Sequence, residues 1–151
     1  MELKYSRKIE DESIAVKAMG TDLNISFKHA VVICDKLRGM KLSDATSLLE
    51  AVEALEKSIP FKRFNKGVGH RPRSEEFKIG KYPQKAASEF LKILRNLESN
   101  AEFKGLDTEN LKIIHAAAQK GLSRKKIAPK GRWRRWVTQL VNVQVIAEET
   151  L

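Results

Sequence analysis

The sequence has little of what secreted, membrane and disulfide-bonded proteins need. Cys34 is the only cysteine among 151 residues, so an internal disulfide is impossible, which fits a reducing compartment. No apolar run approaches the roughly 20 residues that cross a bilayer, and no hydrophobic signal segment follows the first residues. We therefore expect a cytoplasmic protein without a membrane partner.

Catalytic and metal-binding patterns are also missing. His29, His70 and His115 fall in three different predicted elements, and no histidine and cysteine have the spacing of metal ligands. No serine nucleophile motif is present, and Gly67-Val68-Gly69-His70 lacks the Gly-Lys-Ser/Thr ending of a nucleotide-binding loop. The sequence therefore predicts neither an enzyme nor a bound cofactor, metal or small-molecule substrate.

Positive charge is abundant and unevenly placed. The formal net charge is +10 and the pI is about 9.8, which indicates a polyanionic partner, either nucleic acid or an anionic membrane surface. Residues 120–135 contain eight basic residues and no acid, and residues 61–81 contain seven basic residues against two acids. The rest has 14 basic and 17 acidic residues. A nearly neutral body thus carries two basic segments, whereas a merely solvated surface would spread its charge.

Three amphipathic helices are expected between predicted strands. The first begins near Ser26 and ends at Gly39, the second begins at Ser43, and the third begins at Pro83. Their apolar stripes are Phe27, Ala30, Val31, Cys34 and Leu37; then Ala45, Leu48, Leu49, Val52 and Leu55; then Ala86, Ala87, Phe90, Leu91, Leu94, Leu97 and Ala101. We expect these stripes, with the thiol of Cys34, to form the core.

Alternating residues predict three strands. Ile14, Val16 and Ala18 give a weak signal. In residues 111–119 we expect Leu111, Ile113 and His115 on one face and Ile114, Ala116 and Ala118 on the other. In residues 137–147, Val137, Val141, Val143, Val145 and Ala147 share a face opposite Thr138, Asn142 and Gln144. The fold class is therefore α+β, with about three antiparallel strands and three helices packed on one face.

The basic segment between the last two strands is too long for a structureless loop inside a compact domain. It predicts a protruding β-hairpin arm over residues 120–135, with its turn near residues 128–131, where Pro129 and Gly131 suit a turn. At about 3.3 Å per residue the arm would reach roughly 50–60 Å from Leu111. We expect one domain, with a body of residues 14–119 and 136–149 and a basic insertion loop over residues 60–82.

Both basic segments suit RNA. Phosphates neutralise clustered cations, and guanidinium and indole groups stack on unpaired bases. The candidate RNA-binding residues are Lys28, His29, Lys62, Arg63, Lys66, His70, Arg71, Arg73, Lys85, Lys120, Arg124, Lys125, Lys126, Lys130, Arg132, Trp133, Arg134 and Arg135.

Five of the aromatic and cationic positions leave alternatives open. Phe61 and Phe64 anchor the insertion or stack on bases, with anchoring favoured. Trp136 packs at the root of the hairpin or contacts RNA. Lys28 and His29 meet a phosphate at a helix N-terminus or are simply tolerated there.

Seven short motifs follow one another along the chain: Asn24-Ile25-Ser26-Phe27-Lys28-His29-Ala30, Leu37-Arg38-Gly39-Met40-Lys41-Leu42, Asp44-Ala45, Tyr82-Pro83-Gln84-Lys85-Ala86, Lys130-Gly131-Arg132, Val141-Asn142-Val143 and Glu148-Glu149. In this order and spacing they resemble the universal large-subunit ribosomal protein L-twenty-two family. Together they span roughly residues 14–149. The insertion, with Asn65-Lys66-Gly67-Val68-Gly69-His70, is similar to archaeal and eukaryotic members, and the total length is similar to archaeal ones.

The resemblance implies a structural constituent of the large ribosomal subunit. Such a protein binds large-subunit rRNA near the exit of the nascent-peptide tunnel, contacts neighbouring ribosomal proteins and assists assembly. Its hairpin threads through rRNA, and its tip lines the tunnel and meets the nascent peptide. The implied tip is Lys126, Ile127, Ala128, Pro129, Lys130, Gly131, Arg132, Trp133 and Arg134. The tryptophans are bulkier than the small residues expected there. The alternatives are an RNA-processing enzyme and an architectural nucleic-acid-binding protein.

Overall fold

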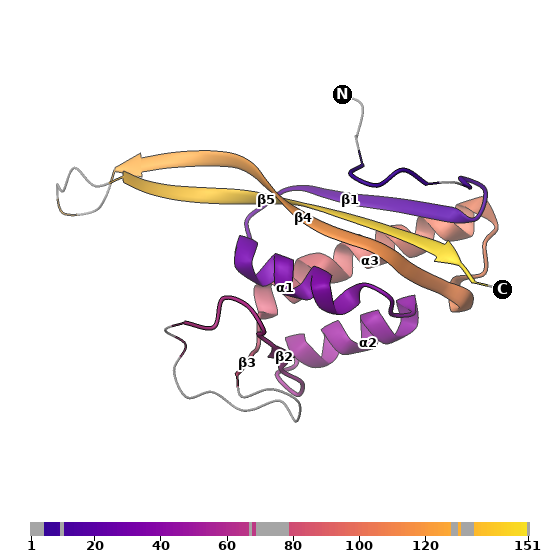
Figure 1. Cartoon of the computed structure of the whole chain (residues 1–151), viewed down its shortest axis with the longest axis horizontal. Helices are drawn as coiled ribbons and strands as arrows, with labels where there is room; N and C mark the ends of the chain where they lie inside the picture. Colours follow the sequence, from indigo (N-terminus) through magenta and orange to yellow (C-terminus); the bar gives the residue numbers. More distant parts are fainter. Residues whose placement is uncertain are drawn as a thin grey trace.

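A three-stranded antiparallel sheet lies on three helices in the computed structural model (Figure 1), which describes residues 5–9, 11–66, 68, 79–127, 130 and 135–150. The elements, in chain order, are β1 (Ala15–Leu23), α1 (Phe27–Leu37), α2 (Leu42–Glu53), β2 (Ile59–Pro60), β3 (Gly80–Lys81), α3 (Gln84–Lys104), the 3₁₀ turn η1 (Thr108–Asn110), β4 (Leu111–Ile127) and β5 (Arg135–Glu149). The sheet order is β1-β5-β4, and β2 pairs with β3 separately. The predicted α+β class is confirmed.

Helix α1 begins directly after Ser26, as predicted, although the Ser26 side chain makes no capping hydrogen bond. The predicted stripe is partly wrong, because Val32 and Ile33 are buried while Val31 is only half-buried. The reason is that α1 is covered on more than one side: it packs against the sheet, and Val32 also faces the segment after β2 near Pro60. Two-sided burial widens an apolar stripe beyond one helical face.

The N-cap of helix α2 lies two residues earlier than predicted. Lys41, not Ser43, is the N-cap, and its carbonyl accepts the first helical bond from the N–H of Ala45 at 3.0 Å. Burial of Leu42 in the core draws that residue into the helix. Leu55 lies beyond the helix end at φ +66° and is 53% exposed, so its assignment to the stripe was wrong.

Helix α3 buries all seven predicted apolar residues and Ile93 in addition. It ends at Gly105, where φ is +74°. The N–H of Leu106 donates to the carbonyl of Ala101 at 3.1 Å, and the N–H of Gly105 donates to that of Glu102 at 2.9 Å. This pair of bonds is the Schellman arrangement, which requires a left-handed residue where the helix stops.

Strand β5 follows the predicted alternation, with Val141, Val143, Val145 and Ala147 fully buried. Strand β4 does not, because an irregularity between Ile113 and His115 adds a residue to one strand of the pair. Beyond it, Ala116 joins Leu111 and Ile113 in the core. The predicted grouping of His115 with Leu111 and Ile113 is therefore wrong, since a bulge exchanges the two faces of a strand.

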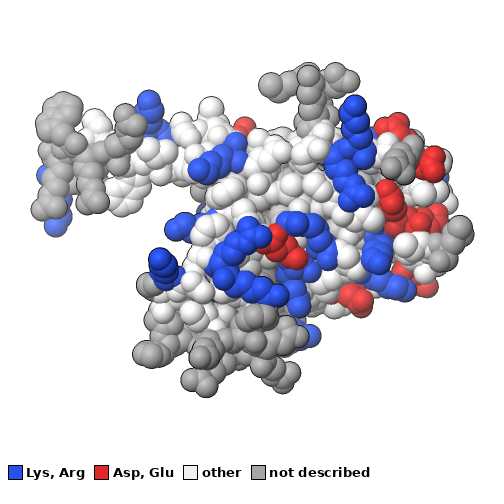
Figure 2. Space-filling model, viewed as in Figure 1, with Lys and Arg blue, Asp and Glu red and all other residues white. Residues whose placement is uncertain are grey.

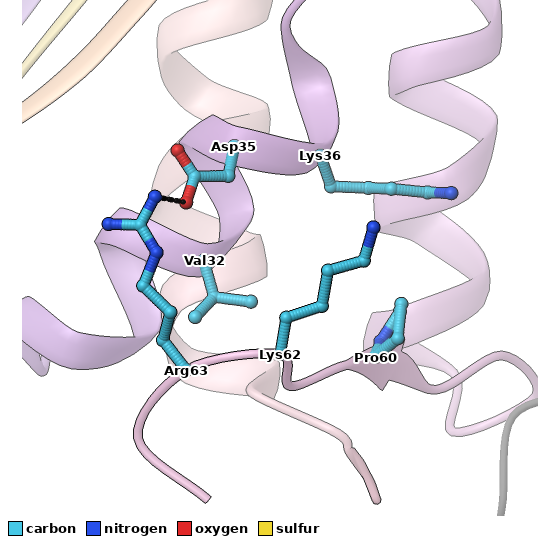
Figure 3. A pocket seen from close by; sticks show the side chains of 6 residues that line it. All are labelled: Val32, Asp35, Lys36, Pro60, Lys62 and Arg63. Atoms are coloured by element: carbon cyan, nitrogen blue, oxygen red, sulfur yellow. Dashed lines mark ion pairs between the residues drawn. The ribbon is translucent and has the colours of Figure 1, made fainter. Parts of the chain in front are cut away.

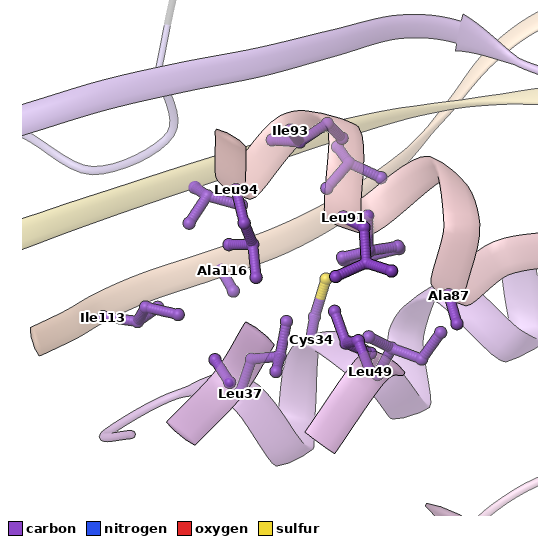
Figure 4. Close-up of a cluster of buried hydrophobic side chains, with 14 of the residues drawn as sticks. Cys34, Leu37, Leu49, Ala87, Leu91, Ile93, Leu94, Ile113 and Ala116 are labelled. Carbon is purple, nitrogen blue, oxygen red and sulfur yellow. The ribbon is translucent and has the colours of Figure 1, made fainter. Parts of the chain in front are cut away.

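The core occupies the layer between the sheet and the helices (Figure 4). Cys34 points from α1 toward Leu91 and Leu94 of α3, with Leu37 and Leu49 beside it. Burial raises the pKa of the Cys34 thiol to about 12, so the thiolate is scarce at neutral pH. The prediction of a core cysteine is confirmed.

The N-terminal segment lies against the opposite face of the sheet. The N–H of Ser6 donates to Oε1 of Gln144 at 3.0 Å, and Oγ of Ser6 lies 2.9 Å from Nε2 of His115. Arg7 donates to the carbonyl of Ile114 at 3.2 Å. Ser6 thus donates both its N–H and its hydroxyl to the side-chain oxygen of Gln144, which is buried on the face of β5 away from the helices.

We predict that Gly105→Ala lowers the free energy of unfolding by about 1–2 kcal/mol, because an L-residue is strained in the left-handed region. A Cβ at this position would meet no atom within 4 Å, so steric contact does not contribute. Urea unfolding measures the change, and the m-value should stay constant. Gly105→Asn should lose less. Equal stability of all three proteins would contradict the conformational role of Gly105.

Candidate nucleic-acid interface

The hairpin extends well past the other elements (Figure 1). Strand pairing between β4 and β5 continues to Ile127 opposite Arg135, whereas β1 pairs with β5 only as far as Leu23 opposite Val141. Leu140 is still buried, but farther along the arm the apolar side chains are exposed: Ile127 is 79% exposed and Trp136 is 55% exposed. The described part of the arm therefore has no core of its own. Burial of Trp136 at the root of the hairpin was one of two interpretations, and it is wrong.

The root of the arm is built around Gly121. A second irregularity in the β4–β5 pairing lies between Lys120 and Ser123. A Cβ on Gly121 would lie 2.9 Å from Oδ1 of Asn142 and 3.0 Å from Oδ1 of Asp22, so a side chain would crowd both. Oδ1 of Asn142 also accepts the N–H of Asp22 at 2.8 Å. Because Gly121 has no side chain, the arm can extend from the body without disturbing the hydrogen bond between Asp22 of β1 and Asn142 of β5.

Basic side chains lie along the arm. Lys120, Arg124, Lys125, Lys126 and Lys130 are all exposed. Lys120 lies over the ring of Phe27, with 5.5 Å between its Nζ and the ring centroid, and thus connects the root to α1. The backbone of Arg135 lies in β5. Ala128, Pro129, Gly131, Arg132, Trp133 and Arg134 lie outside the described residues.

A hollow of about 510 Å³ lies where α1 and α3 begin beside the root of the arm. We call it the root hollow; it is lined by Asn24, Ile25, Ser26, His29, Tyr82, Pro83, Gln84, Lys85, Ala86, Thr138 and Gln139. Neither helix has an acidic residue in its first turn. The partial positive charge of two helix N-termini is therefore uncompensated here, with Lys85 exposed at the edge. The root hollow thus brings together His29 and Lys85, two predicted RNA-binding residues that lie far apart in the sequence.

His29 is half-buried in this hollow and packs edge-on to Phe61, with ring centroids 5.5 Å apart. Burial, and secondly the charge of Lys81, lowers the pKa of His29 below its ordinary value. His29 is therefore neutral at neutral pH. It can offer a hydrogen bond to an RNA group but adds no positive charge.

The insertion is fastened to α1 by its first residues. Phe61 is buried, and Nζ of Lys81 lies 4.9 Å from the centroid of its ring. Arg63 forms a 3.1 Å ion pair with Asp35 of α1. Anchoring is thus confirmed for Phe61.

Phe64, by contrast, is 38% exposed and has Lys28 over its ring at 5.7 Å. Lys28, Lys62, Arg63 and Lys66 are all exposed beside this ring. His70, Arg71 and Arg73 lie outside the described residues.

Charge is polarised along the molecule. In Figure 2, Lys and Arg lie along the arm and over the face formed by α1 and the insertion, while Asp and Glu gather at the end of the body remote from the arm. The acidic end includes Glu12, Asp107 and Glu149, the last two joined by a 3.4 Å hydrogen bond from the N–H of Asp107. A polyanion would be attracted to the first region and repelled by the second.

Neither a metal site nor a membrane span was found in the described part of the chain. No three His, Cys, Asp or Glu side chains lie together there as metal ligands, and none of its helices is long and apolar enough to span a membrane. The arrangement of exposed cations, an exposed indole and an open hollow can bind a folded polyanion. The geometry thus describes a basic α+β binding protein with a projecting hairpin.

Comparisons with known proteins identify the family. A family model described as "Ribosomal protein L22p/L17e" matches residues 18–148. The large ribosomal subunit protein uL22 of Archaeoglobus fulgidus is 51% identical over 148 residues, which cover 97% of this chain and 96% of the relative. The uL22 proteins of Methanococcus vannielii and Thermofilum pendens are 46% and 43% identical, again over at least 96% of each protein. The chain belongs to the uL22 family of large ribosomal subunit proteins.

Family membership confirms the main functional expectations. The protein is a structural constituent of the large ribosomal subunit and not an enzyme. It associates with the ribosome, including its RNA and proteins. The resemblance to archaeal members is also confirmed, since the three relatives named above are archaeal.

We predict that His29 titrates below its ordinary pKa of 6.5 in the free protein. Because the folded pKa is below the unfolded one, the stability from neutral His29 is present above pH 6.5 and is lost as the pH falls through the folded pKa. NMR titration of the ring protons measures the pKa directly.

Urea unfolding at pH values above and below 6.5 measures the corresponding change in stability. The pKa of His115 is lowered too, mainly by burial, so the two histidines act in the same direction. The variant His29→Gln should therefore show a shallower loss of stability below pH 6.5 than the parent protein, without losing it altogether. A His29 pKa at or above the ordinary value would refute the prediction.

Proposed function

We propose that the protein binds large-subunit rRNA near the exit of the nascent-peptide tunnel, and that its arm threads between rRNA segments with the tip in the tunnel wall. The observation that carries the proposal is the strand pair β4–β5, which continues past β1 with exposed cations and no core. An element of this kind is poorly stabilised by its own chain. It becomes useful when another macromolecule surrounds it.

Electrostatics favour RNA as that macromolecule. Arg124, Lys125 and Lys126 lie on consecutive positions of one strand and repel each other in water. Phosphates on both sides of the arm would remove this repulsion and release counterions, which makes binding stronger at low salt. The exposed indole of Trp136 offers a surface on which an unpaired base can stack.

The body supplies a second contact region. The root hollow joins two helix N-termini to the root of the arm, and the fastened part of the insertion adds Lys62, Arg63 and Lys66 beside Lys28. RNA entering along this face would meet positive potential before it reaches the arm. The acidic end would then face away from RNA, toward solvent or basic ribosomal proteins.

The tip carries the proposed contact with the nascent peptide. Within the described part of the tip, Lys126, Ile127 and Lys130 are exposed, and Lys130 lies in a turn with a φ of +66°. Ile127 would give the tunnel wall an apolar contact for the nascent peptide, and Lys126 and Lys130 would place positive charge on either side of it. The arm would also help assembly by tying together rRNA segments that lie apart.

We predict that shortening the arm leaves the body folded but weakens binding to folded large-subunit rRNA. An Asn-Gly turn in place of residues 124–138 would join Ser123 to Gln139, which are paired across the hairpin. The variant should keep its cooperative urea transition, because the core residues of the body are retained. Filter binding should show lower affinity and a shallower salt dependence, and the variant should be lost from large subunits washed in high salt.

A charge variant separates the shape of the arm from its cations. Arg124→Gln/Lys125→Gln/Lys126→Gln keeps the strands and should reduce the slope of log K against log salt by up to about three. Duplex DNA at the same salt serves as competitor. Equal affinity of the parent protein for duplex DNA and rRNA, or full retention of the shortened variant on washed subunits, would refute the proposal.

A further inference from the structure

A second hollow, of about 320 Å³, lies between α1 and the segment that follows β2. We call it the lysine hollow; it is lined by Val32, Asp35, Lys36, Pro60, Lys62 and Arg63 (Figure 3). Of the basic residues in this lining, Lys62 and Arg63 were predicted to bind RNA and Lys36 was not. The hollow is separate from the root hollow, with which it shares no residue.

Two ammonium groups approach each other in this hollow. Lys36 projects from the last turn of α1, and Lys62 reaches from below toward it (Figure 3). Lys36 makes no ion pair with any described side chain. A phosphate placed between them would be attracted by both ammonium groups.

Among the described residues that line the hollow, Asp35 is the one carboxylate, and it is paired with arginines. Asp35 pairs with Arg63 at 3.1 Å and also with Arg38 on the next turn of α1. The ion pair holds Arg63 at the edge of the hollow, where its side chain remains 65% exposed. The described lining thus comprises three basic residues and one carboxylate, and the ion pair with Asp35 orients Arg63.

The hollow also has an apolar part. Val32 is buried and lies between Arg63 and Lys62, and Pro60 is half-buried and lies on the other side of Lys62, below Lys36 (Figure 3). The volume is at the lower end of the range in which proteins hold small ligands, roughly 300–1,000 Å³. An apolar floor with cations at its edge matches a ribonucleotide, whose base or ribose is flat and weakly polar while its phosphate is an anion. Unpaired nucleotides are the part of RNA that proteins recognise in this way.

We propose that the lysine hollow binds one unpaired nucleotide of the rRNA, with its phosphate between Lys36 and Lys62 and its base or ribose on Val32 and Pro60. Arg63 is placed to stack on the base or to contact the next phosphate. This inference rests on the proposed function, because it assumes that the face formed by α1 and the insertion meets RNA. It adds a specific subsite, and it assigns a role to Lys36.

The test uses the full chain and a hexameric oligouridylate as probe. At 17.1 kDa the protein is suited to methyl NMR, and the Val32 methyl groups report on the floor of the hollow. The oligouridylate should shift these signals in the parent protein and in Lys112→Gln, which removes an exposed charge from the start of β4. It should not shift them in Lys36→Gln/Lys62→Gln. The methyl groups of Val143, buried under the sheet, should stay unchanged throughout.

A second measurement connects the hollow with rRNA. In filter binding, Lys36→Gln/Lys62→Gln should reduce the salt slope for folded large-subunit rRNA by about one, as expected for one lost phosphate, while Lys112→Gln should leave it unchanged. If the parent and the double variant bind rRNA with the same slope, the subsite is wrong and the proposed function stands. If the parent fails to bind rRNA, both fall. Val32 shifts with hexaglutamate but not with oligouridylate would assign the hollow to an acidic protein segment and overturn the nucleotide proposal.

Discussion

The antiparallel pairing of β4 with β5 is the constraint on which the rest of the molecule depends. Along its inner half, the pair forms two of the three strands of the sheet and presents Val141, Val143, Val145 and Ile113 to the helices. Along its outer half, the same hydrogen-bonded ladder continues without any layer beneath it. One continuous structure is therefore a core element at one end and an unsupported projection at the other. The inner half sets the direction in which the outer half points.

Residues at the junction show how the two halves are kept distinct. Gly121 lies beside Asn142 of β5 and Asp22 of β1, where a side chain would crowd the side-chain oxygens of both residues. Lys120 then lies over Phe27, so that the first cation of the arm is also a contact of α1. The packed body and the basic arm therefore meet at Lys120. A partner that binds the arm is placed beside the first turns of α1 and α3.

Separation of charge follows from this geometry. Basic residues gather on the arm and on the face of α1 and the insertion, and acidic residues gather at the far end of the body (Figure 2). The phosphates of RNA attract the basic side of such a protein and repel its acidic end. The ion pairs of Asp35 with Arg38 and Arg63 show a further device, in which a carboxylate orients guanidinium groups without removing the net positive charge of the surface.

Much of the fold could be read from the sequence because its signals are local. The stripe of α3 and the alternation of β5 each depend on the spacing of neighbouring side chains. Predictions failed where a distant part of the chain intervened. Burial from a second side added Val32 and Ile33 to the stripe of α1, and a bulge in β4 exchanged the faces of His115 and Ala116.

The candidate site shows the same division. The sequence by itself determined which residues are cationic and that they cluster in two segments, because charge is a property of residue type. Only the tertiary structure decided that Lys36 of α1 shares a hollow with Lys62, that Phe61 is buried while Phe64 is exposed, and that two helix N-termini meet beside the arm. These facts depend on how α1, α3 and the insertion pack, and packing is a property of distances between residues that lie far apart along the chain.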